Sequence, residues 1–124
     1  MAKKVRDIRW LDAPQAHDYP AALSYLSLVF PGARARTLVA KLRRARVTMF
    51  KATDIFRASS LPSVGMNSAR VARDRKMISK GTPLSPILLV RDTVHGKVVI
   101  ADGYHRLCAI YSYNEDAEIP CQIV

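Results

Sequence analysis

The chain has 124 residues, of which 49% are hydrophobic and 24% charged, and its formal net charge at pH 7 is +10. This length suits a single domain with one core, and the composition excludes an intrinsically disordered chain. No segment is apolar for long enough to span a bilayer, so we expect no membrane partner. The basic opening residues are not followed by the apolar run of a signal peptide, which predicts a cytoplasmic protein.

The excess positive charge lies in the first two thirds of the chain. Residues 1–80 contain 17 lysines and arginines against 5 acidic residues, whereas residues 81–124 contain 3 against 5. A basic field of this size attracts nucleic acid, nucleotides or anionic lipid. The solvated faces of ordinary helices explain the same charge equally well, so charge by itself does not specify a binding site.

The first 56 residues predict a loosely alternating arm or edge strand (1–12), two helices and a strand. Asp18 can cap the first helix, whose apolar residues recur at helical spacing as far as Phe30. The second helix covers residues 33–46 and carries a narrow apolar stripe among basic side chains. Residues 47–56 have the composition of a strand.

The rest of the chain predicts a third helix, a hairpin, a fourth helix and a closing strand. Either Asn67 or Ser68 can cap the third helix, and Gly96 supplies the tight turn of the hairpin. The expected ranges are 68–79 for the third helix, 87–90 and 98–101 for the hairpin strands, 104–113 for the fourth helix and 119–124 for the last strand. Helices mixed with short strands in this order predict a compact α/β (α+β) domain.

The segment Asp102-Gly103-Tyr104-His105-Arg106 carries the main functional signal. A turn from a strand into a helix points free backbone N–H groups and the positive end of the helix dipole at one spot, which attracts anions. Gly103 lets a phosphate approach the backbone, and Arg106 can donate two hydrogen bonds to phosphate oxygens. His105 can bind phosphate or move a proton, and Asp102 can hold a metal ion or accept a proton from a substrate hydroxyl. The competing interpretation is a plain turn with a helix cap.

The same residues, continued through Leu107-Cys108-Ala109, resemble the G-x-x-R signature of the ParB/sulfiredoxin-like fold. The strand 86–90, the hairpin and the closing strand also fall where that fold places them. The resemblance covers about residues 47–124, and residues 1–46 are then an added basic helical segment of the same single domain. It implies a small mixed sheet with helices, and a nucleotide-phosphate site at Gly103, His105 and Arg106.

Members of this family include ParB proteins, which are CTP-dependent DNA clamps, sulfiredoxin, which is an ATP-dependent reductase, and a free serine kinase; some relatives are described as nucleases. Sulfiredoxin has its catalytic cysteine directly before the His-Arg pair, where this chain has Tyr104. ParB proteins typically have a glutamate at that position, which serves the metal and hydrolysis. The turn is therefore closer to the kinase-like members, in which an acidic residue assists a hydroxyl.

The resemblance implies a nucleotide-binding domain, either an NTP-dependent phosphotransferase or a hydrolase, that uses Mg²⁺ with its nucleotide. Asp102 and His105 are then the expected catalytic residues, and Asp102 is the expected metal ligand. Two alternatives remain open from the sequence. One is a non-catalytic module that binds DNA or a partner through the basic helices, including the cluster between Arg70 and Lys80; the other is a ParB-like nuclease.

Two further residues at the ends of predicted strands are candidate phosphate ligands. Arg57 follows the strand 47–56, where a salt bridge to Asp54 is the competing interpretation. Ser85 precedes the apolar strand, where a plain turn competes. The thiols of Cys108 and Cys121 lack metal-ligand spacing and favour two core residues in a reducing compartment over a disulfide framework.

Overall fold

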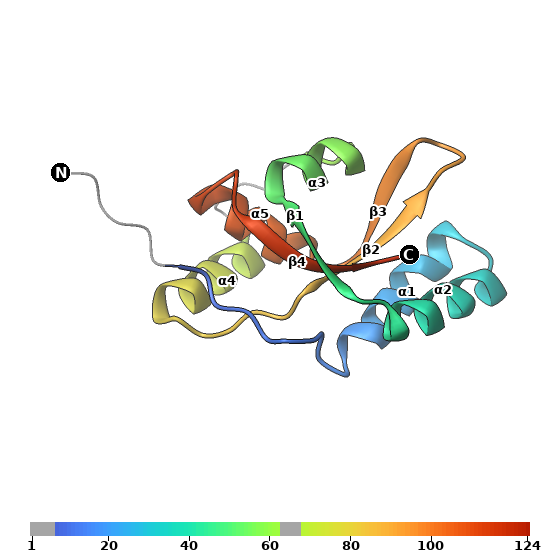
Figure 1. The fold of residues 1–124 in the computed structure, drawn as a ribbon, viewed down its shortest axis with the longest axis horizontal. Helices are drawn as coiled ribbons and strands as arrows, with labels where there is room; N and C mark the ends of the chain where they lie inside the picture. Colours follow the sequence, from blue (N-terminus) through green and yellow to red (C-terminus); the bar gives the residue numbers. More distant parts are fainter. Residues whose placement is uncertain (1–6, 63–67) are drawn as a thin grey trace.

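The computed structural model describes residues 7–62 and 68–124 of the chain. Over these residues a four-stranded mixed sheet is accompanied by five helices (Figure 1). The elements in chain order are α1 (Asp18–Val29), α2 (Gly32–Arg44), β1 (Val47–Lys51), α3 (Ala52–Ser59), α4 (Ala69–Lys80), β2 (Ile87–Asp92), β3 (Lys97–Asp102), α5 (Tyr104–Tyr113) and β4 (Glu118–Ile123).

The strands are ordered β1-β4-β2-β3 in the sheet. β2 and β3 pair antiparallel, which confirms the predicted hairpin, and Gly96 in its turn has a φ of 64°. After α5 the chain returns as β4, which lies parallel to β2 and antiparallel to β1. The mixed sheet with helices confirms the expected α/β (α+β) class.

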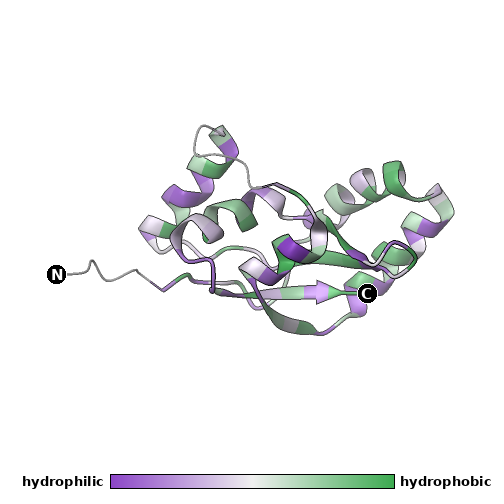
Figure 2. Ribbon diagram, turned by 90° about the horizontal axis from the view of Figure 1, so that it is seen from above, coloured by the Kyte–Doolittle hydropathy of each residue, from purple (hydrophilic) through white to green (hydrophobic). Residues whose placement is uncertain are grey.

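Helices cover both faces of the central strand β2. Ile87 and Leu89 belong to a core cluster with residues of α3, α4 and α5, whereas Leu88 and Val90 belong to a second cluster with residues of α1 and α2. Successive side chains of a strand point to opposite faces, so this double cover explains the unbroken apolar run of β2. In Figure 2 the central strands are mostly hydrophobic, and hydrophilic residues recur along the helices.

The two N-terminal helices are confirmed, with one correction. α2 buries a stripe that includes Leu38, Val39 and Leu42, and its arginines are exposed. α1 begins at Asp18, so the prediction that Asp18 precedes the helix as its N-cap is wrong. His17 occupies the cap position, and Asp18 is buried inside the first turn.

The predicted strand over residues 47–56 is wrong in its second half. β1 ends at Lys51, and the N–H group of Ala52 donates to the carbonyl of Ala117 in the turn before β4. The chain then continues as α3, in which Ala52 and Ile55 are buried at helical spacing. The apolar residues of this stretch therefore form one face of a short helix instead of one face of a strand.

The remaining expectations concern a helix cap, the thiols and the membrane. The hydroxyl of Ser68 accepts a hydrogen bond from the N–H of Val71 and caps α4, while Asn67 lies outside the described residues. Cys108 and Cys121 are buried and are not joined by a disulfide, as expected for core residues. Within residues 7–62 and 68–124, no helix has both the length and the apolar character needed to cross a membrane.

Candidate functional site

The predicted turn connects β3 to α5. β3 ends at Asp102, Gly103 has a φ of 104°, and α5 begins at Tyr104. No side chain caps this helix, and its first backbone hydrogen bond runs from the N–H of Leu107 to the carbonyl of Gly103. The N–H groups of the preceding helical residues have no intrahelical acceptor, so this end of α5 has the electrostatic character of an anion site.

Gly103 is required by packing inside the turn. A Cβ atom at this position would lie 2.9 Å from Nη2 of Arg106 and 2.9 Å from Cγ1 of Ile87. Its φ also lies in the region that L-residues rarely adopt. The glycine therefore makes room for the guanidinium group of Arg106 over the backbone, independently of any phosphate that approaches the turn.

Arg106 is held within the turn. Its Nη2 donates to Oδ2 of Asp102 at 3.2 Å and to the carbonyl of Pro86 at 3.3 Å. The side chains of Arg106 and Asp102 are only 17% and 19% exposed. Nε of Arg106 is buried and lacks a hydrogen-bond partner among the described residues. This guanidinium therefore neutralises Asp102 and fixes the turn against the start of β2.

A second carboxylate reaches the turn from the N-terminal helix. Asp18 is 2% exposed, accepts hydrogen bonds from the hydroxyl of Ser85 and the N–H of Gln15, and interacts with Asp102. Burial raises the pKa of Asp102; the charge of Asp18 raises it further, and the charge of Arg106 opposes both. Ser85, a predicted phosphate ligand, is itself buried and directs its hydroxyl to Asp18.

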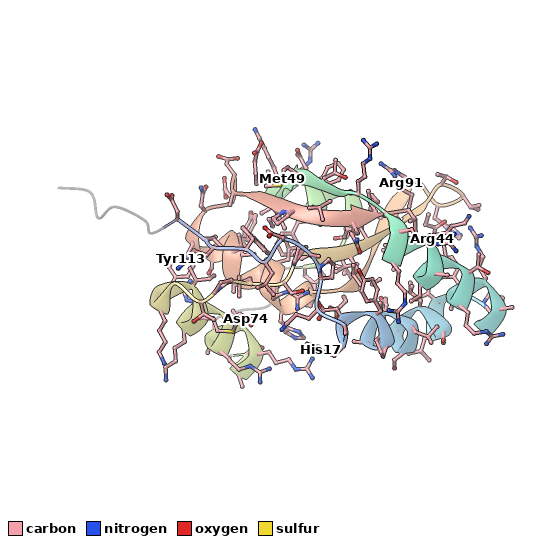
Figure 3. The ribbon with its side chains drawn as sticks, turned by 60° about the horizontal axis from the view of Figure 1, so that its bottom comes forward. His17, Arg44, Met49, Asp74, Arg91 and Tyr113 are labelled. Carbon is pink, nitrogen blue, oxygen red and sulfur yellow. The ribbon has the colours of Figure 1, made fainter. Side chains whose placement is uncertain are left out.

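A cavity of about 140 Å³ opens at the turn, between the start of α5 and helix α4. Arg70, Arg73 and Asp74 of α4 line it together with residues 102–106. Burial raises the pKa of Asp74, and the positive charges of Arg106 and Arg73 oppose this rise most strongly. Figure 3 shows α4 at the lower left of the molecule, with Asp74 on the side of the helix that is turned towards the other elements.

The basic cluster of α4 is divided between two places. Arg70 and Arg73 line the cavity, whereas the guanidinium group of Arg75 lies 4.2 Å from the ring centroid of Tyr113 and donates to Ser112. Helical spacing places Arg73 on one face with Lys76 and Lys80, and that face was a candidate for contact with a nucleic-acid backbone. In the structure Arg70 and Arg73 line the cavity at the predicted phosphate turn.

His105 lines the same cavity, and its pKa is lowered. Burial is the main cause, and the positive charge of Arg70 adds to it, while Asp74 opposes it. The imidazole is therefore neutral at pH 7 and offers one donor and one acceptor nitrogen. Its ring also makes an edge contact with Tyr104, at 5.3 Å between centroids.

We expect the substitution Arg70→Ala to raise the pKa of His105, and Asp74→Asn to lower it, because each removes a charge that acts on the imidazole. NMR titration of the histidine ring protons measures both changes. Lys76→Ala is the matched control, since it removes an exposed α4 charge that does not line the cavity. An unchanged pKa in Arg70→Ala would show that Arg70 does not act on His105.

A second cavity, of about 530 Å³, adjoins the first. The two share Arg70 and the residues 102–105. Apolar and aromatic residues make up most of the rest of the second cavity's lining: Ala21, Tyr25, Leu61, Pro62, Ile100 and Ala101. The site is thus a cleft with a charged end at α4 and an apolar end at α1.

The structure does not bring Arg57 to this cleft. Arg57 lies on α3, is 82% exposed, and its nearest acidic partner is Asp54 at 3.9 Å. It lines neither cavity, so the competing interpretation of a local ion pair describes it. Asp102 was also the expected metal ligand. Among the described residues, no group of three or more His, Cys, Asp or Glu side chains is arranged so that it could hold a metal ion.

Two site residues, Asp18 and Asp74, were not identified from the sequence. The available signal for Asp18 is that it is the one charged residue in the otherwise uncharged segment of α1. Asp74 is the single acidic residue among the five basic residues of α4. An isolated charge of this kind inside a contrasting helix is a reason to look for a partner elsewhere in the fold.

Comparison with protein-family models, with curated proteins and with solved structures gave no match to this chain.

Proposed function

We propose that this chain is a nucleotide-binding domain of the ParB/sulfiredoxin-like type, which holds the phosphates of its ligand at residues 102–106. The observation that carries the proposal is the cleft itself. Its charged end gathers the side chains of Arg70, Arg73, His105 and Arg106 at an uncapped helix N-terminus, and its other end is apolar. A phosphate ester with an attached apolar or aromatic group matches both ends.

Arg70 and Arg73 are the residues that this proposal assigns to the phosphates. Both are exposed on α4, and neither makes a hydrogen bond or ion pair with the part of the chain that the structure describes. Guanidinium groups bind phosphate through paired hydrogen bonds, so two arginines beside a helix N-terminus favour a polyphosphate. Arg106 contributes charge while it remains hydrogen-bonded to Asp102.

The proposed activity is phosphoryl transfer or hydrolysis. Mg²⁺ in such enzymes is commonly held by one or two carboxylates together with the phosphates, and Asp74 and Asp102 are the carboxylates that face this cavity. The metal ion would supply charge neutralisation at the transferred phosphate. His105, neutral at pH 7, is placed to accept the proton of an attacking hydroxyl or water.

Nucleotide binding is tested by thermal denaturation with ATP, ADP, CTP or GTP, each with and without Mg²⁺. A ligand at one hundred times its Kd stabilises the native state by about 2.7 kcal/mol, a rise in Tm of roughly 8 to 15 °C for a domain of this size. We expect Arg70→Ala and Arg73→Ala each to weaken binding by about 10- to 150-fold, since a hydrogen bond to a charged group contributes about 1.5 to 3 kcal/mol. Lys76→Ala should bind as the unmodified chain does.

A DNA-binding module is the second candidate, and helix α2 is the observation that favours it. α2 exposes Arg34, Arg36, Lys41, Arg43 and Arg44 and contains no acidic residue. Contacts of such a face with a nucleic-acid backbone fall steeply with salt and ignore base sequence. If no nucleotide shifts Tm while DNA binds with a steep salt dependence that α2 substitutions reduce and Arg70→Ala does not, the nucleotide proposal is wrong and α2 is the site.

A further inference from the structure

The apolar end of the cleft is built by the N-terminal helix. Ala21 and Tyr25 of α1 line the larger cavity together with Ile100 of β3 and Tyr104 of α5. These α1 residues belong to the segment that lies outside the likeness to the ParB/sulfiredoxin-like fold. The residues that distinguish this chain from that fold therefore form one wall of its cleft.

Helix α1 is anchored at the phosphate turn by its first residue. Asp18 is buried against Asp102 and Ser85. Residues at positions i, i+3 and i+7 share one side of a helix, so Ala21 and Tyr25 follow Asp18 along the side that faces the cleft. A rise of about 1.5 Å per residue places Tyr25 about 10 Å along the helix from the anchor.

Tyr25 is an aromatic side chain without a structural role in the described core. Tyr25 is 44% exposed, whereas Ala22 and Leu26 of the same helix are fully buried. No hydrogen bond or ring contact to another described residue holds the Tyr25 ring. An exposed ring on the wall of an apolar recess is well suited to contact a planar ligand group.

We propose that Tyr25 forms the base subsite of the cleft, so that α1 selects nucleotides over inorganic polyphosphate. This inference rests on the proposed function, since it takes the 102–106 turn as the phosphate site. The base of the nucleotide lies in the recess against the Tyr25 ring, and its phosphates extend towards Arg70 and Arg73.

The recess also predicts weak discrimination between bases. The hydroxyl of Tyr104, which lines the recess, already donates to the carbonyl of Pro62. Most of the other side chains that line the recess are apolar. Few side-chain donors and acceptors remain to read the edge of a base. Stacking on an aromatic ring tolerates every base because every base has a π-face.

The test compares ATP with inorganic tripolyphosphate, each titrated calorimetrically in Mg²⁺ into the full chain and three variants. Loss of a base–aromatic stack costs about 1 to 3 kcal/mol, so Tyr25→Ala should weaken ATP binding by about 5- to 150-fold. Tripolyphosphate should bind Tyr25→Ala and the unmodified chain equally. Tyr25→Phe should retain ATP affinity, and so should Leu28→Ala, which removes an exposed side chain of α1 that does not line the recess.

The outcomes separate this inference from the function on which it rests. If neither ATP nor tripolyphosphate binds the unmodified chain, the nucleotide proposal fails and the base subsite fails with it. If both bind but Tyr25→Ala weakens neither, the phosphate site stands and the base subsite is wrong. If Tyr25→Ala weakens both equally, Tyr25 supports the shape of the cleft and does not contact a base, which also overturns the inference.

Discussion

Replacing Gly103 with alanine is expected to lower the free energy of unfolding by about 2 to 5 kcal/mol. Two independent effects contribute. The φ of 104° forces an L-residue into a region that it rarely adopts, and the new methyl group would stand 2.9 Å from both Nη2 of Arg106 and Cγ1 of Ile87. Ile87 is fully buried in the core, so it cannot move aside without disturbing β2.

Gly96→Ala is the matched control for this substitution. Gly96 also has a positive φ, of 64°, but its added Cβ would have no neighbour within 4 Å. It should cost only the left-handed backbone penalty, about 1 to 2 kcal/mol. Urea denaturation of both variants measures the difference. Equal losses at the two glycines would show that the space over Gly103 is not filled by Arg106 and Ile87.

Most of the elements and the strand-to-helix turn at residues 102–106 could be predicted from the sequence because both depend on local patterns. The continuous apolar run of residues 87–90 indicated a strand, and the glycine of the hairpin marked its turn. The helix predicted over residues 104–113 coincides with α5, since Gly103 stops the strand and an apolar face begins immediately after it.

The error at residues 47–56 shows where local patterns fail. Five residues of strand followed by Ala52-Thr53-Asp54-Ile55-Phe56 give an apolar alternation that fits a longer strand. The chain leaves the sheet because the N–H groups of Ala52 and Thr53 bond to carbonyls in the turn before β4. Those carbonyls lie more than 60 residues away in the sequence, so no window around residue 52 contains the reason.

Asp18 and Asp74 were missed as site residues for the same physical reason. Asp18 resembles a helix cap when only its neighbours are considered, and its burial against Asp102 depends on how α1 crosses the end of β3. Arg70 and Arg73 resemble part of a basic surface until α4 is packed beside α5. Residue types and turns are local properties, whereas the charge environment of a site is set by tertiary contacts.

The second large expected effect is that of Arg106→Ala, which should destabilise the fold by about 2 to 4 kcal/mol. The substitution leaves the carboxylate of Asp102 in a mostly buried position beside the negative charge of Asp18, without its ion-pair partner. It also removes a hydrogen bond to the carbonyl of Pro86. For this reason Arg106→Ala does not by itself report on phosphate binding, and Arg70 and Arg73 are the better probes.

The cause of the loss can be isolated with Asp102→Asn. The double variant carries both Asp102→Asn and Arg106→Ala, and no unpaired charge remains at position 102. It should therefore be more stable at neutral pH than Arg106→Ala alone. The free energies of unfolding of the two variants should converge in acid. The pKa of Asp102 is raised in the folded state, so its negative charge destabilises Arg106→Ala at pH values above that pKa. This destabilisation disappears as the pH falls through the raised pKa towards the ordinary 3.8. Urea denaturation of both variants between pH 7 and pH 4 measures this convergence, and their difference cancels the titration of His105 and Asp74. A difference that is independent of pH would show that Arg106 stabilises the turn through Pro86 and its packing over Gly103, and that the Asp102 charge contributes little.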